Sequence, residues 1–146
     1  QPNNLFVAGF IGSPQMNFVD AQCVVEGAKA SLKFDKYQVE LPAEKAKKLI
    51  DGGYAGKTVV LGIRPEDIYD SDEHLEKFAA STIEADITGY ELLGAEVLLY
   101  YSLAGANMTA RVDSDTEARF GDHIKLALDP SKIHVFDKET ELTITN

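Results

Sequence analysis

Hydrophobic and polar residues alternate along most of this chain between Val19 and Val135. A period of two is typical of strands that turn one face toward a core. The alternating runs are Val19–Val25, Ala30–Phe34, Tyr37–Leu41, Ile83–Ile87, Val97–Tyr101, Met108–Val112, Ile124–Leu128 and Ile133–Val135, and Val59–Ile63 is continuously apolar. Short strands at this spacing, separated by Gly, Asp and Pro turns, predict eight or nine strands in a closed or nearly closed all-β architecture. Asp35 and Lys36, between the second and third runs, predict a hairpin turn.

Two segments break this period. Residues 42–50 begin with Pro42, are rich in helix formers and are followed by Gly52 and Gly53. These features predict a short helix with a glycine cap. Its lysines are expected on a solvated face: Lys45, Lys47 and Lys48. Residues 70–76 are polar and acidic, and they predict a surface loop or a single helical turn.

An apolar segment with small residues interposed, Leu5–Gly12, lies almost at the beginning of the chain. It fits either a core element of this domain or the end of a helix that packs against a separate partner domain. We expect residues 1–14 to be a linker segment and residues 15–146 to form one domain. A chain of this length can bury roughly two-thirds of the surface that it exposes when unfolded.

The balance of charge restricts the partners of the chain. Its 24 acidic and 14 basic residues give a formal net charge of −10, which repels nucleic-acid phosphates and anionic lipid headgroups. Nucleic acid is therefore not expected as a partner. The single cysteine, Cys23, rules out an intrachain disulfide and is expected to be a buried, inert thiol. No apolar run reaches the roughly 18 residues of a membrane span, so we expect a soluble cytoplasmic protein.

One glycine-rich stretch approaches a phosphate-binding loop: Gly52-Gly53-Tyr54-Ala55-Gly56-Lys57-Thr58. Its spacing is one residue short, and Asp51 stands where such loops carry a glycine that lets backbone amides wrap the phosphates. The following residues, Val59–Leu61, are typical of a strand, whereas a phosphate-binding loop opens a helix. We therefore exclude a nucleotide site in this stretch.

The sequence predicts no metal, cofactor or catalytic site. Asp113–Glu117 begins like a calcium loop, but Ala118 and Ile124 stand where that loop needs glycine and glutamate, so a turn is expected. The histidines have no neighbouring His, Cys or carboxylate at a spacing that metals select: His74, His123 and His134.

Two runs resemble a known pair of family motifs: Phe10-Ile11-Gly12-Ser13-Pro14-Gln15-Met16-Asn17-Phe18 and Leu61-Gly62-Ile63-Arg64-Pro65-Glu66-Asp67. They are similar to the region after the nucleotide-binding domain in the ATPase subunits of maltose-type and multiple-sugar ABC importers. In that family the first motif lies where the chain leaves the ATPase domain, and the second lies inside the C-terminal regulatory domain. The resemblance covers nearly the whole chain and implies an OB-fold-like (TOBE/MOP-like) barrel with one short helix.

The resemblance also implies a function. The chain would be the regulatory and dimerisation domain of the ATP-binding subunit of a carbohydrate importer. It would be non-catalytic and hold no cofactor, because ATP and Mg would belong to the ATPase domain of the parent subunit. The implied partners are a second copy, that ATPase domain, the membrane permease subunits through the parent and, in some members, a sugar phosphotransferase regulator. The complex would lie at the inner face of the cell membrane.

The motifs give the candidate site residues. The domain junction is expected at Phe10, Ile11, Gly12, Ser13, Pro14, Met16 and Asn17, where glycine and proline together would turn the chain. Structural roles are expected for Gly62, Ile63, Arg64, Pro65 and Glu66, with the donor fork of Arg64 fixing the connecting loop. Glu91, Gly94 and Glu96 match a family hairpin in which the glycine lets the turn close.

The last alternating run supplies interface candidates. If Ile133 and Val135 face the core, His134 and Phe136 lie on the opposite side. An exposed Phe136 would invite a partner, and the resemblance implies that Gly121, His134 and Phe136 contribute to a dimer or partner interface. The alternative is a second apolar layer that buries Phe136 within the same chain.

Two other functions compete with this reading. Related barrels in oxyanion importers hold an anion or a sugar between two copies, so the chain could be a small-ligand-binding barrel. A nucleic-acid-binding barrel would need a basic face with interleaved aromatic residues, which the acidic composition does not offer.

Overall fold

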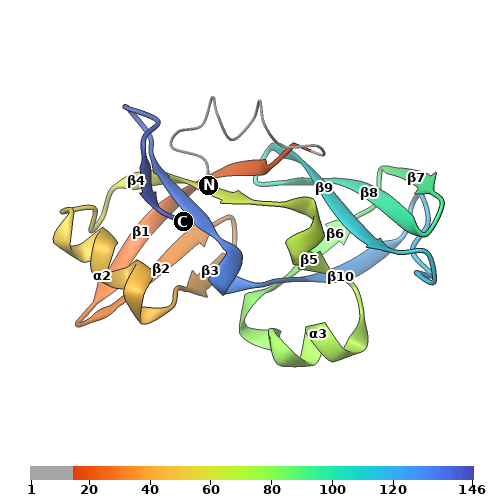
Figure 1. Cartoon of the computed structure of the whole chain (residues 1–146), viewed down its shortest axis with the longest axis horizontal. Coiled ribbons are helices and arrows are strands. Elements are labelled where there is room, and N and C mark those ends of the chain that lie inside the picture. The colour runs from red at the N-terminus through yellow and green to blue at the C-terminus, as the bar shows by residue number, and fades with distance from the viewer. Residues whose placement is uncertain (1–14) are drawn as a thin grey trace.

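The computed structural model describes residues 15–146, and strands make up most of its regular structure (Figure 1). The strands are β1 (Asn17–Glu26), β2 (Lys29–Phe34), β3 (Tyr37–Glu40), β4 (Thr58–Ile63), β5 (Ile68–Tyr69), β6 (Thr82–Asp86), β7 (Gly89–Leu93), β8 (Glu96–Leu103), β9 (Ala106–Asp113), β10 (His123–Leu128), β11 (His134–Asp137) and β12 (Thr143–Thr145). The α-helices of these residues are α2 (Ala43–Asp51) and α3 (Asp72–Lys77). Short 3-10 turns are η1 (Pro65–Asp67), η2 (Ala79–Ser81) and η3 (Pro130–Lys132). The all-β class is confirmed.

The strands form three sheets. The largest has the order β12-β11-β4-β1-β2-β3, and the two smaller ones have the orders β5-β10-β6 and β7-β8-β9. All their pairings are antiparallel. The ladder is interrupted after β4 because Pro65, which has no N–H to donate, opens η1. The three sheets therefore form no single continuous hydrogen-bonded ladder, and they contact one another through the side chains of the shared core.

Nine of the twelve strands coincide with the runs that the sequence pattern predicts. The three others carry no alternation signal. β5 and β12 have two and three residues, too few for a period of two to register. β7 ends in two consecutive exposed leucines, Leu92 and Leu93.

The alternating apolar residues face one main core that draws on all three sheets. Val19 contributes from the six-stranded sheet, Leu126 from β10 and Leu99 from β8. Cys23 lies in this core, as expected. Figure 1 places α2 at one end of the long axis and β7 at the other.

Helix α2 begins after Pro42 and ends at a glycine pair in which Gly53 has φ +76°. The short helix and its glycine cap are thereby confirmed. The prediction that Lys45 is solvated is wrong, because Lys45 lies four residues before Leu49 and on the same face, which packs into the core. Its Nζ donates to the backbone oxygen of Asn146, and burial lowers the pKa of its ammonium group.

The acidic segment 70–76 contains helix α3, which is preceded by Ser71 as its N-cap. The Ser71 hydroxyl accepts the backbone N–H of His74. The rings of Tyr69 and His74 stack with centroids 3.9 Å apart and interplanar angle 6°. α3 lies beside β10 in Figure 1 and contributes to a surface groove described below.

Candidate domain-junction site

The two family motifs form one structural unit. β1 pairs with β4 so that Asn17 lies opposite Ile63 and Phe18 opposite Gly62. β11 flanks the other side of β4, with His134 opposite Gly62. The entrance of the chain into the domain, the second motif and the closing strand therefore lie side by side. Phe10, Ile11, Gly12, Ser13 and Pro14 lie outside the described residues.

Asn17 joins β1 to β9 through its side-chain amide. Its Nδ2 donates to the backbone oxygen of Thr109 at 2.8 Å, and its Oδ1 accepts the backbone N–H of Thr109 at 2.7 Å. Asn17 is only 5% exposed. A side chain with a donor and an acceptor side by side can make two hydrogen bonds to the C=O and N–H of one residue, which explains an asparagine here.

Gly62 makes room for a second apolar cluster on the outer face of the six-stranded sheet. This cluster contains Met16, Val60 and Phe136, with Phe18 packed against it. A Cβ at position 62 would lie 2.7 Å from the sulfur of Met16 and 3.0 Å from Cε1 of Phe136. No alanine can occupy that space unless the cluster shifts.

The prediction that Phe136 is exposed is wrong. Ile133 and Val135 do face the main core, and Phe136 does lie on the opposite side, but its side chain is fully buried in the second cluster. The ring of Phe18 packs edge-on against it, with the centroids 5.8 Å apart. The alternative of a second apolar layer within the chain is therefore the one observed.

His134 is also buried, and its Nδ1 lies 3.2 Å from Oδ1 of Asn146. Burial lowers the pKa of its imidazole. An interface role for His134 or Phe136 stays a prediction, but neither offers an exposed side chain to a partner.

The remainder of the second motif turns the chain out of β4. Ile63 is buried in the main core, Pro65 is buried at the start of η1, and Glu66 is exposed. The guanidinium of Arg64 makes no hydrogen bond within residues 15–146, so its loop-fixing role stays a prediction.

The hairpin between β7 and β8 lies at the end of the fold opposite α2 (Figure 1). Gly94 has φ +71°, a left-handed conformation that glycine adopts without strain, as the turn requires. Glu91 accepts a hydrogen bond from the Tyr100 hydroxyl at 2.7 Å. Glu96 lies 3.6 Å from Nε of Arg111. The Glu91–Tyr100 hydrogen bond thus joins the two strands of this hairpin, and the Glu96–Arg111 contact joins β8 to β9.

Gly121 belongs to the same end of the fold. Its N–H donates to the backbone oxygen of Ile87, which holds the 114–122 loop against the end of β6. The guanidinium of Arg119 lies 4.8 Å from the centroid of the Tyr90 ring. Phe120, which lies between Arg119 and Gly121 in the sequence, is 74% exposed, and it is the most exposed large hydrophobic side chain of residues 15–146. We call Leu92, Phe120 and Gly121 the distal surface.

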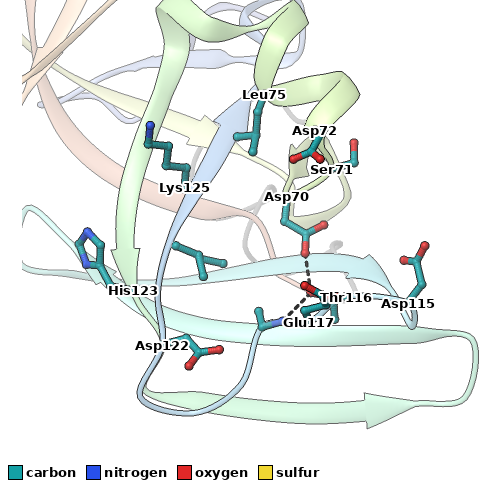
Figure 2. A pocket seen from close by; sticks show the side chains of 12 residues that line it. Asp70, Ser71, Asp72, Leu75, Asp115, Thr116, Glu117, Asp122, His123 and Lys125 are labelled. Carbon is teal, nitrogen blue, oxygen red and sulfur yellow. Dashed lines mark hydrogen bonds between the residues drawn. The ribbon is translucent and has the colours of Figure 1, made fainter.

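A groove lies between α3, the 114–122 loop and β10, with a volume of about 570 Å³ (Figure 2). Five carboxylates line it: Asp70, Asp72, Asp115, Glu117 and Asp122. The Thr116 hydroxyl donates to Asp70 at 2.5 Å and accepts the backbone N–H of Ala118. These bonds fix the loop to the segment before α3. No group of three or more His, Cys, Asp or Glu among the described residues could hold a metal ion.

The sequence did not predict the hydrogen bonds between Asn17 and Thr109 or the exposure of Phe120. Thr109 lies 92 residues from Asn17, and neither residue signals the other in the sequence.

A helix long and apolar enough to cross a membrane does not occur in the part of the chain that the structure describes.

Two family models match the chain. The MalK OB fold domain matches residues 12–68 and the TOBE domain matches residues 61–136. The two matches overlap at the second motif and include every described strand except β12 and the last residue of β11.

Proteins similar to this chain are ATP-binding proteins of sugar importers. MsmX of Bacillus subtilis, an oligosaccharide import protein, is 41% identical over 98% of this chain. MsmK of Streptococcus mutans, a multiple sugar-binding transport protein, is 38% identical over 99% of it. MalK of Thermococcus litoralis, for trehalose and maltose import, is 35% identical over 96%. The chain spans only 37–38% of the length of these relatives.

A solved structure shares the fold at low sequence identity. The molybdate-bound form of the cytoplasmic molybdate-binding protein ModG aligns with a TM-score of 0.60 and 16% identity, over 82% of this chain and 94% of that one. The family is established by the TOBE domain model, which matches more than half of the chain, and the MalK OB fold model and the three relatives agree with it. The chain belongs to the C-terminal OB-fold and TOBE domains of the ATP-binding subunits of sugar ABC importers.

Proposed function

We propose that this chain is the regulatory and dimerisation domain of the ATP-binding subunit of a carbohydrate ABC importer. The parent subunit couples ATP hydrolysis to sugar uptake, with ATP and Mg in its ATPase domain. This chain is the non-catalytic part. The observation that carries the proposal is the junction unit, in which Asn17, Gly62 and Phe136 fix the first strand to the rest of the domain.

The junction suits a segment that transmits the position of an ATPase domain. At the point where the chain enters β1, Met16 is buried in the second apolar cluster, and Asn17 is buried and hydrogen-bonded to Thr109. Because β1 is central in the six-stranded sheet, a displacement of its first residues acts on the strands beside it. We place the contact with the ATPase domain at residues 10–17. The permease subunits are partners of the parent at the cytoplasmic face of the membrane.

The distal surface is the proposed contact with a second copy of the domain. Large apolar side chains that stay exposed in a soluble protein mark interaction sites when they gather in one place. Leu92 and Phe120 are 61% and 74% exposed. The segment of Phe120 meets the strand of Leu92 where the guanidinium of Arg119 lies over the ring of Tyr90 on β7. A sugar phosphotransferase regulator, where one exists, is a further candidate partner of the domain.

Light scattering across a concentration series tests this proposal. We expect the 146-residue chain to form a concentration-dependent dimer and Phe120→Ala to weaken it on the order of tenfold. Leu142→Ala is the matched control, because Leu142 is also exposed, at 55%, but lies between β11 and β12. Equal effects of the two substitutions would exclude the distal surface. A monomer at every concentration would contradict self-association of the domain.

A small-ligand-binding barrel is the second candidate, and the groove favours it. Its volume of about 570 Å³ lies within the range of ligand sites. Its five carboxylates disfavour an anion, so a neutral sugar is the ligand class to test. A sugar-specific rise in melting temperature that Asp115→Asn abolishes would support it, and no shift with any sugar would exclude it.

A further inference from the structure

A cluster of four charged residues joins two of the sheets at the surface. His123 begins β10, Glu84 and Asp86 lie on the neighbouring strand β6, and Lys36 lies in the β2–β3 turn. Nε2 of His123 is 2.8 Å from Oε1 of Glu84, and Nδ1 is 2.7 Å from Oδ1 of Asp86. Both ring nitrogens therefore face a carboxylate.

Glu84 is shared with the β2–β3 hairpin. Its second carboxylate oxygen, Oε2, is 3.5 Å from Nζ of Lys36. Its backbone N–H donates to the Tyr37 hydroxyl at 2.9 Å. The tip of this hairpin, which belongs to the six-stranded sheet, is thus bound to a strand of the β5-β10-β6 sheet.

The geometry around His123 suits only one charge state. A neutral imidazole has one N–H donor and one acceptor nitrogen, whereas the imidazolium ion has two donors. Two carboxylates are acceptors only, so both contacts become hydrogen bonds when the ring is protonated. After the proton is lost, one carboxylate faces a nitrogen lone pair and that contact turns repulsive.

Other charged groups also surround the imidazole of His123. Lys125, two residues further along β10, lies opposite Glu84 in the ladder, and Asp122 precedes His123. His123 and Lys125 also line the groove, together with its carboxylates Asp70, Asp72, Asp115, Glu117 and Asp122. Among the described residues, the carboxylates within hydrogen-bond distance of the His123 ring are Glu84 and Asp86. Glu84 and Asp86 therefore dominate the surroundings of the ring.

We propose that His123, Glu84, Asp86 and Lys36 form a pH-dependent clasp between the β2–β3 hairpin and the β5-β10-β6 sheet. The clasp is closed while His123 is protonated. Deprotonation breaks the contact to one carboxylate and loosens the tip of the hairpin. The clasp is independent of the proposed role in transport and follows from the contacts of these side chains.

The direction of the pH dependence follows from the two kinds of group. The hydrogen bond to Glu84, and then that to Asp86, raise the pKa of His123 above its ordinary value of 6.5. Its stabilising contribution is complete below 6.5 and is lost as the pH rises through the raised pKa of the folded chain. The hydrogen bond from His123, followed by the charge of Lys36, lowers the pKa of Glu84 below 4.5, so its contribution is lost only in more acidic solution.

Nuclear magnetic resonance of the whole chain tests the clasp. The imidazole of His123 is titrated from about pH 5 to about pH 9, a range that covers the ordinary titration of histidine. We expect its pKa to lie above the ordinary value and to fall in Asp86→Asn. Asp20→Asn is the control, because it removes the same charge at the Lys138 pair and should leave the pKa of His123 unchanged.

The backbone amides of Lys36 and Tyr37 provide the second readout. If the clasp holds the hairpin, their chemical shifts should change with the same midpoint as the His123 ring, and the change should vanish in His123→Asn. A His123 pKa at or below its ordinary value would overturn the proposal. So would hairpin amides that stay constant while the ring titrates.

Discussion

Asn17 shows how one side chain can fix two strands that share no backbone ladder in the structure. Its amide makes both hydrogen bonds that a neighbouring strand would make to Thr109. An aspartate can accept from the Thr109 N–H but cannot donate to its carbonyl oxygen, and an aliphatic side chain can do neither. The requirement for asparagine is therefore one of chemistry as well as size.

Replacement of Asn17 by alanine should destabilise the domain by about 2 kcal/mol, because it removes two hydrogen bonds and leaves buried backbone groups without partners. Urea unfolding measures this loss. Asn107→Ala is the matched control: Asn107 lies on β9 two residues before Thr109, is exposed, and should change the stability by less than about 0.5 kcal/mol. Similar losses in both variants would contradict the special role of Asn17.

At this scale the sequence predicted that Met16, Asn17 and Gly62 matter, but not why. Their importance rested on motif resemblance. The reasons are contacts between distant parts of the chain: Thr109 for Asn17, and Phe136 and Met16 for Gly62. No local pattern carries such information. Phe136 was placed on the correct side of β11, and its burial depends on Met16, which precedes β1, and on Phe18 in β1.

At the scale of elements, the β8–β9 hairpin is closed by a two-residue turn whose first residue, Ala104, is unfavourable for its backbone conformation. Ala104 and Gly105 both have positive φ, +50° and +82°, as in a type I′ turn. Glycine adopts this conformation freely, whereas alanine is strained in it. Asparagine followed by glycine is the sequence that this turn prefers.

Ala104→Asn should therefore stabilise the domain by roughly 0.5–1 kcal/mol, because asparagine tolerates the left-handed conformation better than alanine does. Thermal unfolding measures the gain. Gly105→Ala should have the opposite sign: no atom lies within 4 Å of the added Cβ, so its cost would come from the backbone alone. Stabilisation by both substitutions would show that the turn has another conformation.

The elements themselves were largely predictable because burial on one face imposes the period of two. The same logic failed where burial did not control the pattern. β7 is an edge strand with both leucines exposed, and β5 is too short to show a period. The lysines of α2 looked equivalent in sequence, yet only Lys45 shares the face of Leu49. The groove and the His123 cluster depend on how loops meet, which no periodicity describes.

At the scale of the whole molecule, one core connects all three sheets. Cys23 on β1, Leu99 on β8 and Leu126 on β10 belong to the same cluster of buried residues. The clamp of Asn17 on Thr109 and the cluster around His123 add polar links between these sheets. A domain of this size with a single core is expected to unfold in one cooperative step.

Cys23 offers a direct test, since it is the single thiol of the chain, is fully buried, and has a pKa raised by that burial. A thiol reagent attacks the thiolate, so the native chain should resist labelling. We expect labelling across a urea series to follow the same transition as the circular dichroism of the strands. Labelling at lower urea would mean that the six-stranded sheet opens while other sheets persist. Coincident curves would establish that the junction at β1 and the distal surface at β7 belong to one cooperative unit.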